Sequence, residues 1–224
     1  MRAFEHAVEL GYRYLETDVQ ATSDGQLLVF HDPTLDRVTN QTGVIADLSW
    51  DRVSKARVAG TEPIPRFAEL LASWDDVRIN VDCKRANAVE PLIRVIKSTG
   101  ALDRVCLSGF DHGRLRYLRD ALGAGLCTSM SPRETLQARL ASLCGRAIAA
   151  RHAGCIQVPV RQGRIPIVDR RFLACARRAG MPVHVWTIDD AAEMNRLLDL
   201  GVEGIMTDRP TILREVLQAR SQWR

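Results

Sequence analysis

Two carboxylates and an imidazole near the start of the chain have a spacing that suits metal binding. Glu16 and Asp18 stand two residues apart in the strand-like run Tyr-Leu-Glu-Thr-Asp-Val. On a β-strand they would share one face, roughly 6–7 Å apart, and could converge on one hard cation. His31 ends a second strand-like run. If the Asp-Gly dipeptide at 24–25 forms a two-residue turn, residues whose numbers add up to 49 face each other across the hairpin. Asp18 then lies opposite His31.

A third strand-like run, Arg-Ile-Asn-Val-Asp-Cys-Lys, repeats the arrangement. Asp82 and Lys84 alternate with apolar residues there and therefore share one face of a strand. Asp82 would be a further metal ligand, and Lys84 a cation suited to a phosphate oxygen. Burying several carboxylates together without a cation is costly, and oxygen ligands favour Mg²⁺ or Ca²⁺ over zinc. The alternative for the first run is an ordinary solvent-exposed ribbon without a site.

Strand-like and helix-like segments alternate along the whole chain, which predicts a parallel sheet with helices packed on it. The expected strands are 14–20, 26–31, 77–84, 105–110, 125–129, 155–160, 183–188 and 204–207, and the expected helices are 88–98, 111–122, 132–149, 169–178 and 189–200. This order suits an α/β fold of the (β/α)₈ barrel type, whose active site lies at the C-terminal ends of the strands. Ser108 and Phe110, at the end of one strand, would then line the pocket.

The first two strands are an exception, because they are too close in sequence for a parallel crossover. We expect an antiparallel hairpin at 19–31 instead. Counting it as an extension of one barrel strand leaves seven parallel strands, where a closed barrel has eight. Residues 3–10 form an amphipathic helical face that begins without room for an N-cap. We therefore expect one barrel domain over 1–224 whose first strand is missing.

Composition excludes several classes of protein. The chain has 46% hydrophobic residues and 26% charged residues, which rules out intrinsic disorder. A formal net charge of +4 comes from scattered arginines, so no nucleic-acid partner is expected. No apolar run approaches the ~20 residues of a membrane span, and the N-terminus does not resemble a signal peptide. The six cysteines show no Cys-x-x-Cys spacing, which favours reduced thiols and a cytoplasmic location. The oligomeric state is not indicated.

Motifs in order along the chain carry a family resemblance. They are Glu-Thr-Asp-Val-Gln at 16–20, His-Asp-Pro-Thr-Leu-Asp-Arg-Val-Thr at 31–39, Asn-Val-Asp-Cys-Lys at 80–84, Val-His-Val-Trp-Thr at 183–187 and Thr-Asp-Arg-Pro at 207–210. The chain resembles the glycerophosphodiester phosphodiesterase family over essentially its whole length. This resemblance implies a barrel of the phospholipase C-like phosphodiesterase type. It also implies a divalent metal and cleavage of a small-molecule glycerophosphodiester to glycerol 3-phosphate and an alcohol.

Site roles follow from the resemblance by position. Glu16 and Asp18 match metal ligands, and Asp82 stands where the family usually has a glutamate ligand. His31 matches a catalytic histidine, acting as general acid or general base. Lys84 matches the lysine that follows the third ligand.

The resemblance also assigns a role to Trp186, and the chain differs from the family's pattern near its start. Trp186 matches an aromatic residue near the glycerol end of the substrate. The family's His-Arg-Gly strand and Pro-Glu-Asn-Thr helix start have no counterpart here. A catalytically impaired barrel that binds only metal or phosphate, and a protein-interaction domain on a barrel scaffold, stay open as alternatives. A related phosphodiesterase that acts on phosphoinositides or sphingolipids is an alternative closer to the glycerophosphodiester phosphodiesterase interpretation.

Overall fold

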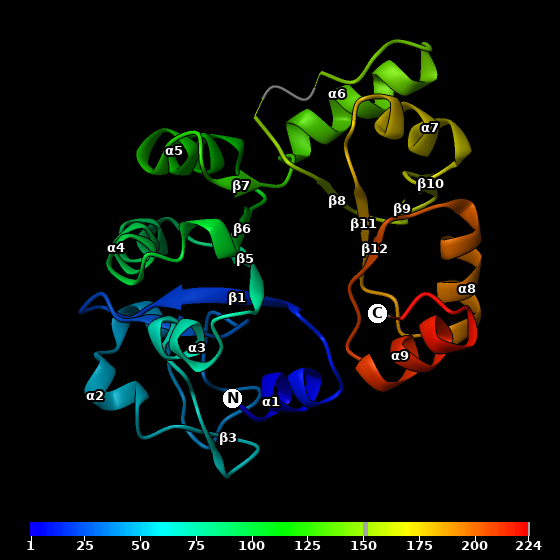
Figure 1. Cartoon of the computed structure of the whole chain (residues 1–224). Helices are drawn as coiled ribbons and strands as arrows, with labels where there is room; N and C mark the ends of the chain where they lie inside the picture. The colour runs from blue at the N-terminus through cyan, green and yellow to red at the C-terminus, as the bar shows by residue number, and fades with distance from the viewer. Residues whose placement is uncertain (150–151, 224) are drawn as a thin grey trace. The chain divides into compact units, whose positions relative to one another are not determined.

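The structure is a computed structural model that describes residues 1–149 and 152–223 (Figure 1). The chain divides into two compact units, Met1–Cys127 (unit 1) and Thr128–Arg224 (unit 2). That both units belong to a single domain stays a prediction. No helix in the described part of the chain is long and apolar enough to cross a membrane.

Unit 1 is built on a sheet that carries most of the polar residues singled out above. Its strands, in spatial order, are β2 (Leu27–Val29), β1 (Tyr14–Ala21), β5 (Arg78–Cys83), β6 (Val105–Ser108) and β7 (Cys127–Thr128). The pairs β1–β5 and β5–β6 are parallel, as the strand–helix alternation predicted. In this register Asp18 lies beside Asp82, which in turn lies beside Ser108. Three parallel strands therefore bring polar residues to one level of the sheet.

The antiparallel hairpin of β1 and β2 is confirmed, but the expected register was wrong. Val19 pairs with Val29, so that paired positions sum to 48. The amide of Phe30 donates to the carbonyl of Asp18 at 3.0 Å. Asp18 is therefore opposite Phe30, and His31 is one residue further along.

The reason for the shift is the turn, which has three residues instead of two. The amide of Thr22 donates to the carbonyl of Gln26 at 3.0 Å, which leaves 23–25 as the loop. Gly25 has a φ of +78°, the left-handed conformation that such a three-residue loop requires at this position. Asp24 fixes the loop by accepting hydrogen bonds from the Thr22 hydroxyl and the Trp50 amide.

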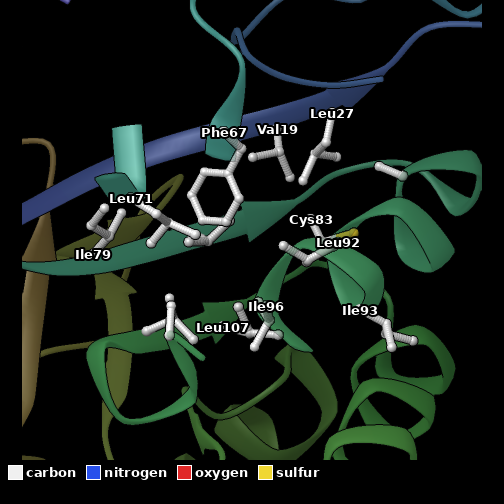
Figure 2. Close-up of a cluster of buried hydrophobic side chains, with 14 of the residues drawn as sticks. Val19, Leu27, Phe67, Leu71, Ile79, Cys83, Leu92, Ile93, Ile96 and Leu107 are labelled. Carbon is white, nitrogen blue, oxygen red and sulfur yellow. The ribbon is translucent and has the colours of Figure 1, made fainter. Parts of the chain in front are cut away.

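Helices cover the sheet of unit 1 and bury its apolar face. They are α1 (Arg2–Glu9), α3 (Phe67–Ser73), α4 (Val89–Thr99) and α5 (His112–Leu122). Unit 1 also contains the shorter helices α2 (Trp50–Val53), η1 (Ile45–Asp47), η2 (Ala86–Ala88) and η3 (Leu102–Arg104), and a separate antiparallel pair of strands, β3 (Arg57–Val58) and β4 (Glu62–Pro63). Figure 2 shows Phe67 and Leu71 of α3 over Val19 and Ile79 of the sheet. Because side chains alternate along a strand, burial of Val19 places Asp18 on the opposite face.

Unit 2 has a second parallel sheet, in the order β12-β11-β8. Its elements are α6 (Pro132–Leu143), β8 (Ile156–Pro159), β9 (Arg161–Gln162), β10 (Ile165–Pro166), α7 (Arg170–Arg178), β11 (Val183–Trp186), α8 (Ala191–Leu200), β12 (Gly204–Ile205) and α9 (Pro210–Ala219). Helix α6 ends at Leu143, earlier than the expected 149, because Gly145 takes a left-handed φ of +68° just beyond it.

Candidate active site

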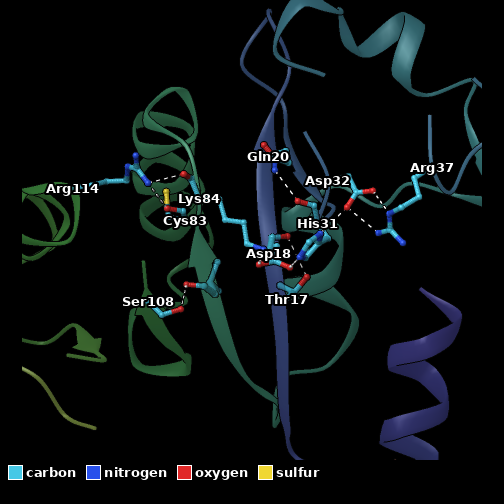
Figure 3. A network of polar contacts seen from close by, with 11 residues as sticks. Thr17, Asp18, Gln20, His31, Asp32, Arg37, Cys83, Lys84, Ser108 and Arg114 are labelled. Atoms are coloured by element: carbon cyan, nitrogen blue, oxygen red, sulfur yellow. Dashed lines mark hydrogen bonds and ion pairs between the residues drawn. The ribbon is translucent and has the colours of Figure 1, made fainter. Parts of the chain in front are cut away.

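Two carboxylates and a lysine lie near the C-terminal ends of β1 and β5. Figure 3 shows two of them, Asp18 and Lys84. Asp18 of β1 and Asp82 of β5 occupy paired positions in the parallel ladder. Lys84, directly after β5, extends toward β1, where its Nζ lies 2.9 Å from Oδ1 of Asp18. The Asp18 side chain is only 14% exposed, so this ion pair is largely shielded from solvent.

Asp82 is the most unusual of these groups, because it is buried without being satisfied. It is 7% exposed, and its Oδ1 has no hydrogen-bond partner among the residues that the structure describes. Burial, and then the nearby charge of Asp18, raise the pKa of Asp82 to about 6 from its ordinary value of 3.8, and the positive charges of Lys84 and Arg114 oppose this. A buried carboxylate oxygen of this kind fits a hard cation, which would satisfy it electrostatically.

His31 approaches the carboxylates from the end of the hairpin. Its Nε2 lies 4.0 Å from Oδ2 of Asp18, and its Nδ1 lies 2.7 Å from Oδ1 of Asp32. Gln20 of β1 donates from Nε2 to the backbone carbonyl of His31 at 3.0 Å. Although the expected hairpin register was wrong, His31 and Asp18 are neighbours as predicted, because His31 directly follows Phe30, the residue opposite Asp18.

Asp32 and Arg37 belong to the 31–39 motif, but the sequence analysis gave neither residue a role in the site. Arg37 donates from Nε to Oδ2 of Asp32 at 2.5 Å and from Nη2 to Oδ1 at 2.9 Å. These hydrogen bonds from Arg37, together with the one shared with His31, hold the pKa of Asp32 well below its usual range. The available signal was the direct adjacency of Asp32 to His31, followed by an arginine five residues later.

A pocket of about 650 Å³ opens beside His31 and Lys84. Its lining consists of Gln20, His31, Pro33, Ala46, Lys84, Arg85, Ala86, Asn87 and Arg114. None of these nine described residues is acidic, and three are lysine or arginine. Arg114 of α5 is held in place by donating from Nη1 to the carbonyls of Cys83 and Lys84, at 2.9 and 2.8 Å. The pocket therefore suits an anion.

The remaining predicted site residues are less closely gathered. Glu16 is exposed on β1, one level away from Asp18 and beside Asn80. Ser108, half-buried at the end of β6, donates to the carbonyl of Val81 at 3.4 Å. Within 1–149 and 152–223, no group of three His, Cys, Asp or Glu side chains is close enough together to hold a metal. The predicted three-carboxylate set thus stays a prediction.

Two aromatic residues were also predicted to contact the substrate. Phe110 follows β6 in unit 1 and is 65% exposed. Trp186 is the last residue of β11 in unit 2 and is half-buried. The substrate contacts of both residues stay predictions.

Comparison with known proteins identifies the family. The sequence profile of the glycerophosphoryl diester phosphodiesterase family matches residues 1–212. A Mycobacterium tuberculosis protein named "Probable glycerophosphodiester phosphodiesterase 2" is 37% identical over an alignment of 227 residues, which covers 100% of this chain and 86% of that protein.

Solved structures show the same fold. A glycerophosphoryl diester phosphodiesterase from Parabacteroides distasonis matches with a TM-score of 0.78 at 19% identity, covering 98% of this chain and 80% of that one. An Oleispira antarctica phosphodiesterase, solved with the product sn-glycerol-3-phosphate, matches with a TM-score of 0.77 at 19% identity, covering 96% and 90%. The expected α/β barrel fold class is thereby confirmed. The chain belongs to the glycerophosphoryl diester phosphodiesterase family, a family of phosphoric diester hydrolases.

Proposed function

We propose that the chain hydrolyses glycerophosphodiesters to glycerol 3-phosphate and an alcohol with the help of a divalent cation. The observation that carries this proposal is the unsatisfied buried oxygen of Asp82, which lies next to the Asp18–Lys84 pair. The cationic pocket beside it suits a phosphodiester anion. The names of the relatives, and the product bound to the Oleispira enzyme, support the same reaction class.

The oxygen chemistry of Asp18 and Asp82, which occupy paired positions in the ladder, suits Mg²⁺ or Ca²⁺, and these two carboxylates would hold the ion. Glu16, one level away on β1, stays a predicted third ligand. When bound, the ion would polarise the phosphodiester oxygens and make the phosphorus easier to attack. Asp82 is one methylene shorter than the glutamate usual in the family, so its oxygens reach less far from β5.

Lys84 and His31 would supply the remaining chemistry. The Lys84 ammonium would neutralise negative charge that grows on the phosphoryl oxygens in the transition state. Nε2 of His31 would either take a proton from an attacking hydroxyl or give one to the departing alcohol. Ser108, Phe110 and Trp186 stay candidate substrate contacts.

The test is turnover of glycerophosphocholine by the whole chain, with glycerol 3-phosphate measured in Mg²⁺, in Ca²⁺ and in EDTA. His31→Ala and Glu16→Ala should each lower turnover by on the order of 10²-fold or more. Asp51→Ala, which removes a carboxylate from a surface ion pair with Lys55, is the matched control.

Two outcomes would contradict the proposal. Near wild-type turnover by His31→Ala or Glu16→Ala would refute these assignments. If the unsubstituted chain bound the cation in calorimetry without turning over glycerophosphocholine, phosphoinositides or sphingolipids, the alternative of a barrel that only binds metal or phosphate would be favoured.

A further inference from the structure

The imidazole of His31 is fixed by hydrogen bonds rather than by packing. Its side chain is 64% exposed, so neighbouring side chains cover only a small part of the ring. The bond from Nδ1 to Asp32, at 2.7 Å, gives the ring one orientation. Asp32 itself is only 13% exposed and is held by both hydrogen bonds from Arg37. Gln20, which is buried, holds the backbone carbonyl of His31.

We propose that Asp32, held by Arg37, is a positioning residue that keeps the proton of neutral His31 on Nδ1 and so makes Nε2 the nitrogen that exchanges a proton with the substrate. This inference rests on the proposed function, which assigns His31 to catalysis. One proton crosses at Nε2 in either direction. It passes from the attacking hydroxyl to Nε2 as the new P–O bond forms, or from Nε2 to the alcohol oxygen as the old P–O bond breaks.

The position of the proton follows from the chemistry of the partners. Two guanidinium hydrogen bonds favour the ionised form of Asp32. An ionised carboxylate only accepts hydrogen bonds, so the hydrogen between the two residues belongs to Nδ1. A neutral imidazole carries one N–H, which leaves Nε2 as the acceptor. Nε2 is also the ring nitrogen that lies toward Asp18, at 4.0 Å (Figure 3).

The loop that carries Arg37 is well anchored. Leu35 and Ile45 are both 1% exposed and pack in one apolar cluster. The amide of Leu35 donates to the carbonyl of Gly43, and the amide of Ile45 donates to the carbonyl of Pro33, each at 3.0 Å. Arg37 therefore lies in a loop whose two sides are anchored by burial and backbone hydrogen bonds.

The experiment compares Asp32→Asn with the unsubstituted chain by kinetics and by ¹⁵N NMR of the His31 ring. An asparagine has nearly the same shape, but it can offer either an oxygen or an NH₂ group to Nδ1, so both neutral tautomers become populated. We expect kcat to fall on the order of 10²-fold with little change in KM. At about pH 8.5, where imidazole is ordinarily neutral, the unsubstituted chain should show the Nδ1–H tautomer, and Asp32→Asn a mixture.

A second pair of variants tests the role of Arg37. Arg37→Lys keeps a positive charge with fewer donors and should retain more activity than Arg37→Gln. Asp51→Asn, in the surface pair with Lys55, is the matched control and should change neither kcat nor the His31 spectrum.

The outcomes separate this inference from the proposed function. An Nε2–H tautomer in the unsubstituted chain would overturn the inference without any variant being needed. So would an unchanged kcat in Asp32→Asn while His31→Ala is inactive, because His31 would then be catalytic without positioning by Asp32. An active His31→Ala would instead refute the proposed function.

Discussion

Asp82 combines a charge that is unfavourable in the cation-free protein with an oxygen suited to the cation proposed above. Its carboxylate is buried, close to Asp18, and lacks a hydrogen bond at Oδ1 among the described residues. In the folded chain its pKa is raised to about 6, whereas 3.8 is the ordinary value. The folded state therefore binds a proton more tightly than the unfolded state does, and ionising Asp82 lowers the free energy of unfolding as pH rises from about 4 through 6.

Asp82→Asn removes this ionisation and should stabilise the cation-free protein at alkaline pH. In EDTA at about pH 8 we expect the free energy of unfolding to increase on the order of 2 kcal/mol. The gain should shrink at about pH 5, where Asp82 of the unsubstituted chain is mostly protonated. Urea denaturation at the two pH values measures the difference. If Asp82→Asn instead lowered the free energy of unfolding equally at both pH values, the charge of Asp82 would not be unfavourable.

The same variant separates stability from cation binding. Mg²⁺ or Ca²⁺ should raise the Tm of the unsubstituted chain, because a ligand that binds only the folded state stabilises it. In Asp82→Asn this rise should be largely lost. Asp51→Asn is the control, because the carboxylate that it removes is exposed, and this variant should keep the rise in Tm.

At the scale of elements, the strands and their parallel order could be predicted from the alternation of apolar and polar runs. The hairpin register could not be predicted, because Asp24-Gly25 fits a three-residue loop as well as a two-residue turn. A shift of one residue moves every cross-strand pair, so Asp18 meets Phe30 rather than His31 in the ladder.

Whether a candidate site residue could be predicted from the sequence depends on the element that carries it. Asp18 and Asp82 could be predicted because strand periodicity fixes their face. Arg114 could not, because α5 brings it to the site through a tertiary contact that has no spacing in the sequence. The chain contains many arginines, and nothing in their spacing distinguishes Arg114, whereas Arg37 stands five residues after Asp32 in the motif at 31–39.

The end of α3 illustrates how one side chain joins elements of unit 1. Arg104, in η3, donates from Nη1 to the carbonyl of Trp74 at 2.7 Å and from Nη2 to that of Leu71 at 3.1 Å. The last carbonyls of a helix lack partners within it. Arg104 therefore completes the C-terminus of α3 just before β5, the strand that carries Asp82.

Arg104→Gln should leave these carbonyls only partly satisfied and lower the free energy of unfolding by about 2 kcal/mol. Arg104→Lys, which keeps the charge but not the two-nitrogen geometry, should have an intermediate effect. Urea denaturation measures the change, with Arg116→Gln on the exposed face of α5 as the control. A loss no greater than that of the control would show that Arg104 does not stabilise this helix end.

At the scale of the whole molecule, the positions of the charged residues say more about ligand binding than the net charge does. The formal net charge is only +4, with 31 basic and 27 acidic residues. The pocket departs from this balance, because Lys84, Arg85 and Arg114 line it without an acidic residue among the nine described lining residues. The field of positive charges gathered on one part of the surface raises the local concentration of an anion there.

This field predicts a dependence of kcat/KM on ionic strength that differs between substrates. Glycerophosphoglycerol is a net anion, whereas glycerophosphocholine is zwitterionic, so raising NaCl from about 20 to about 300 mM should lower kcat/KM several-fold for the first and less for the second. Arg85, exposed at the pocket rim, carries part of this field, and Arg85→Gln should flatten the salt dependence for glycerophosphoglycerol. Arg116→Gln removes the same charge outside the pocket lining and should not. Equal slopes for Arg85→Gln and Arg116→Gln would mean that net charge alone attracts the substrate.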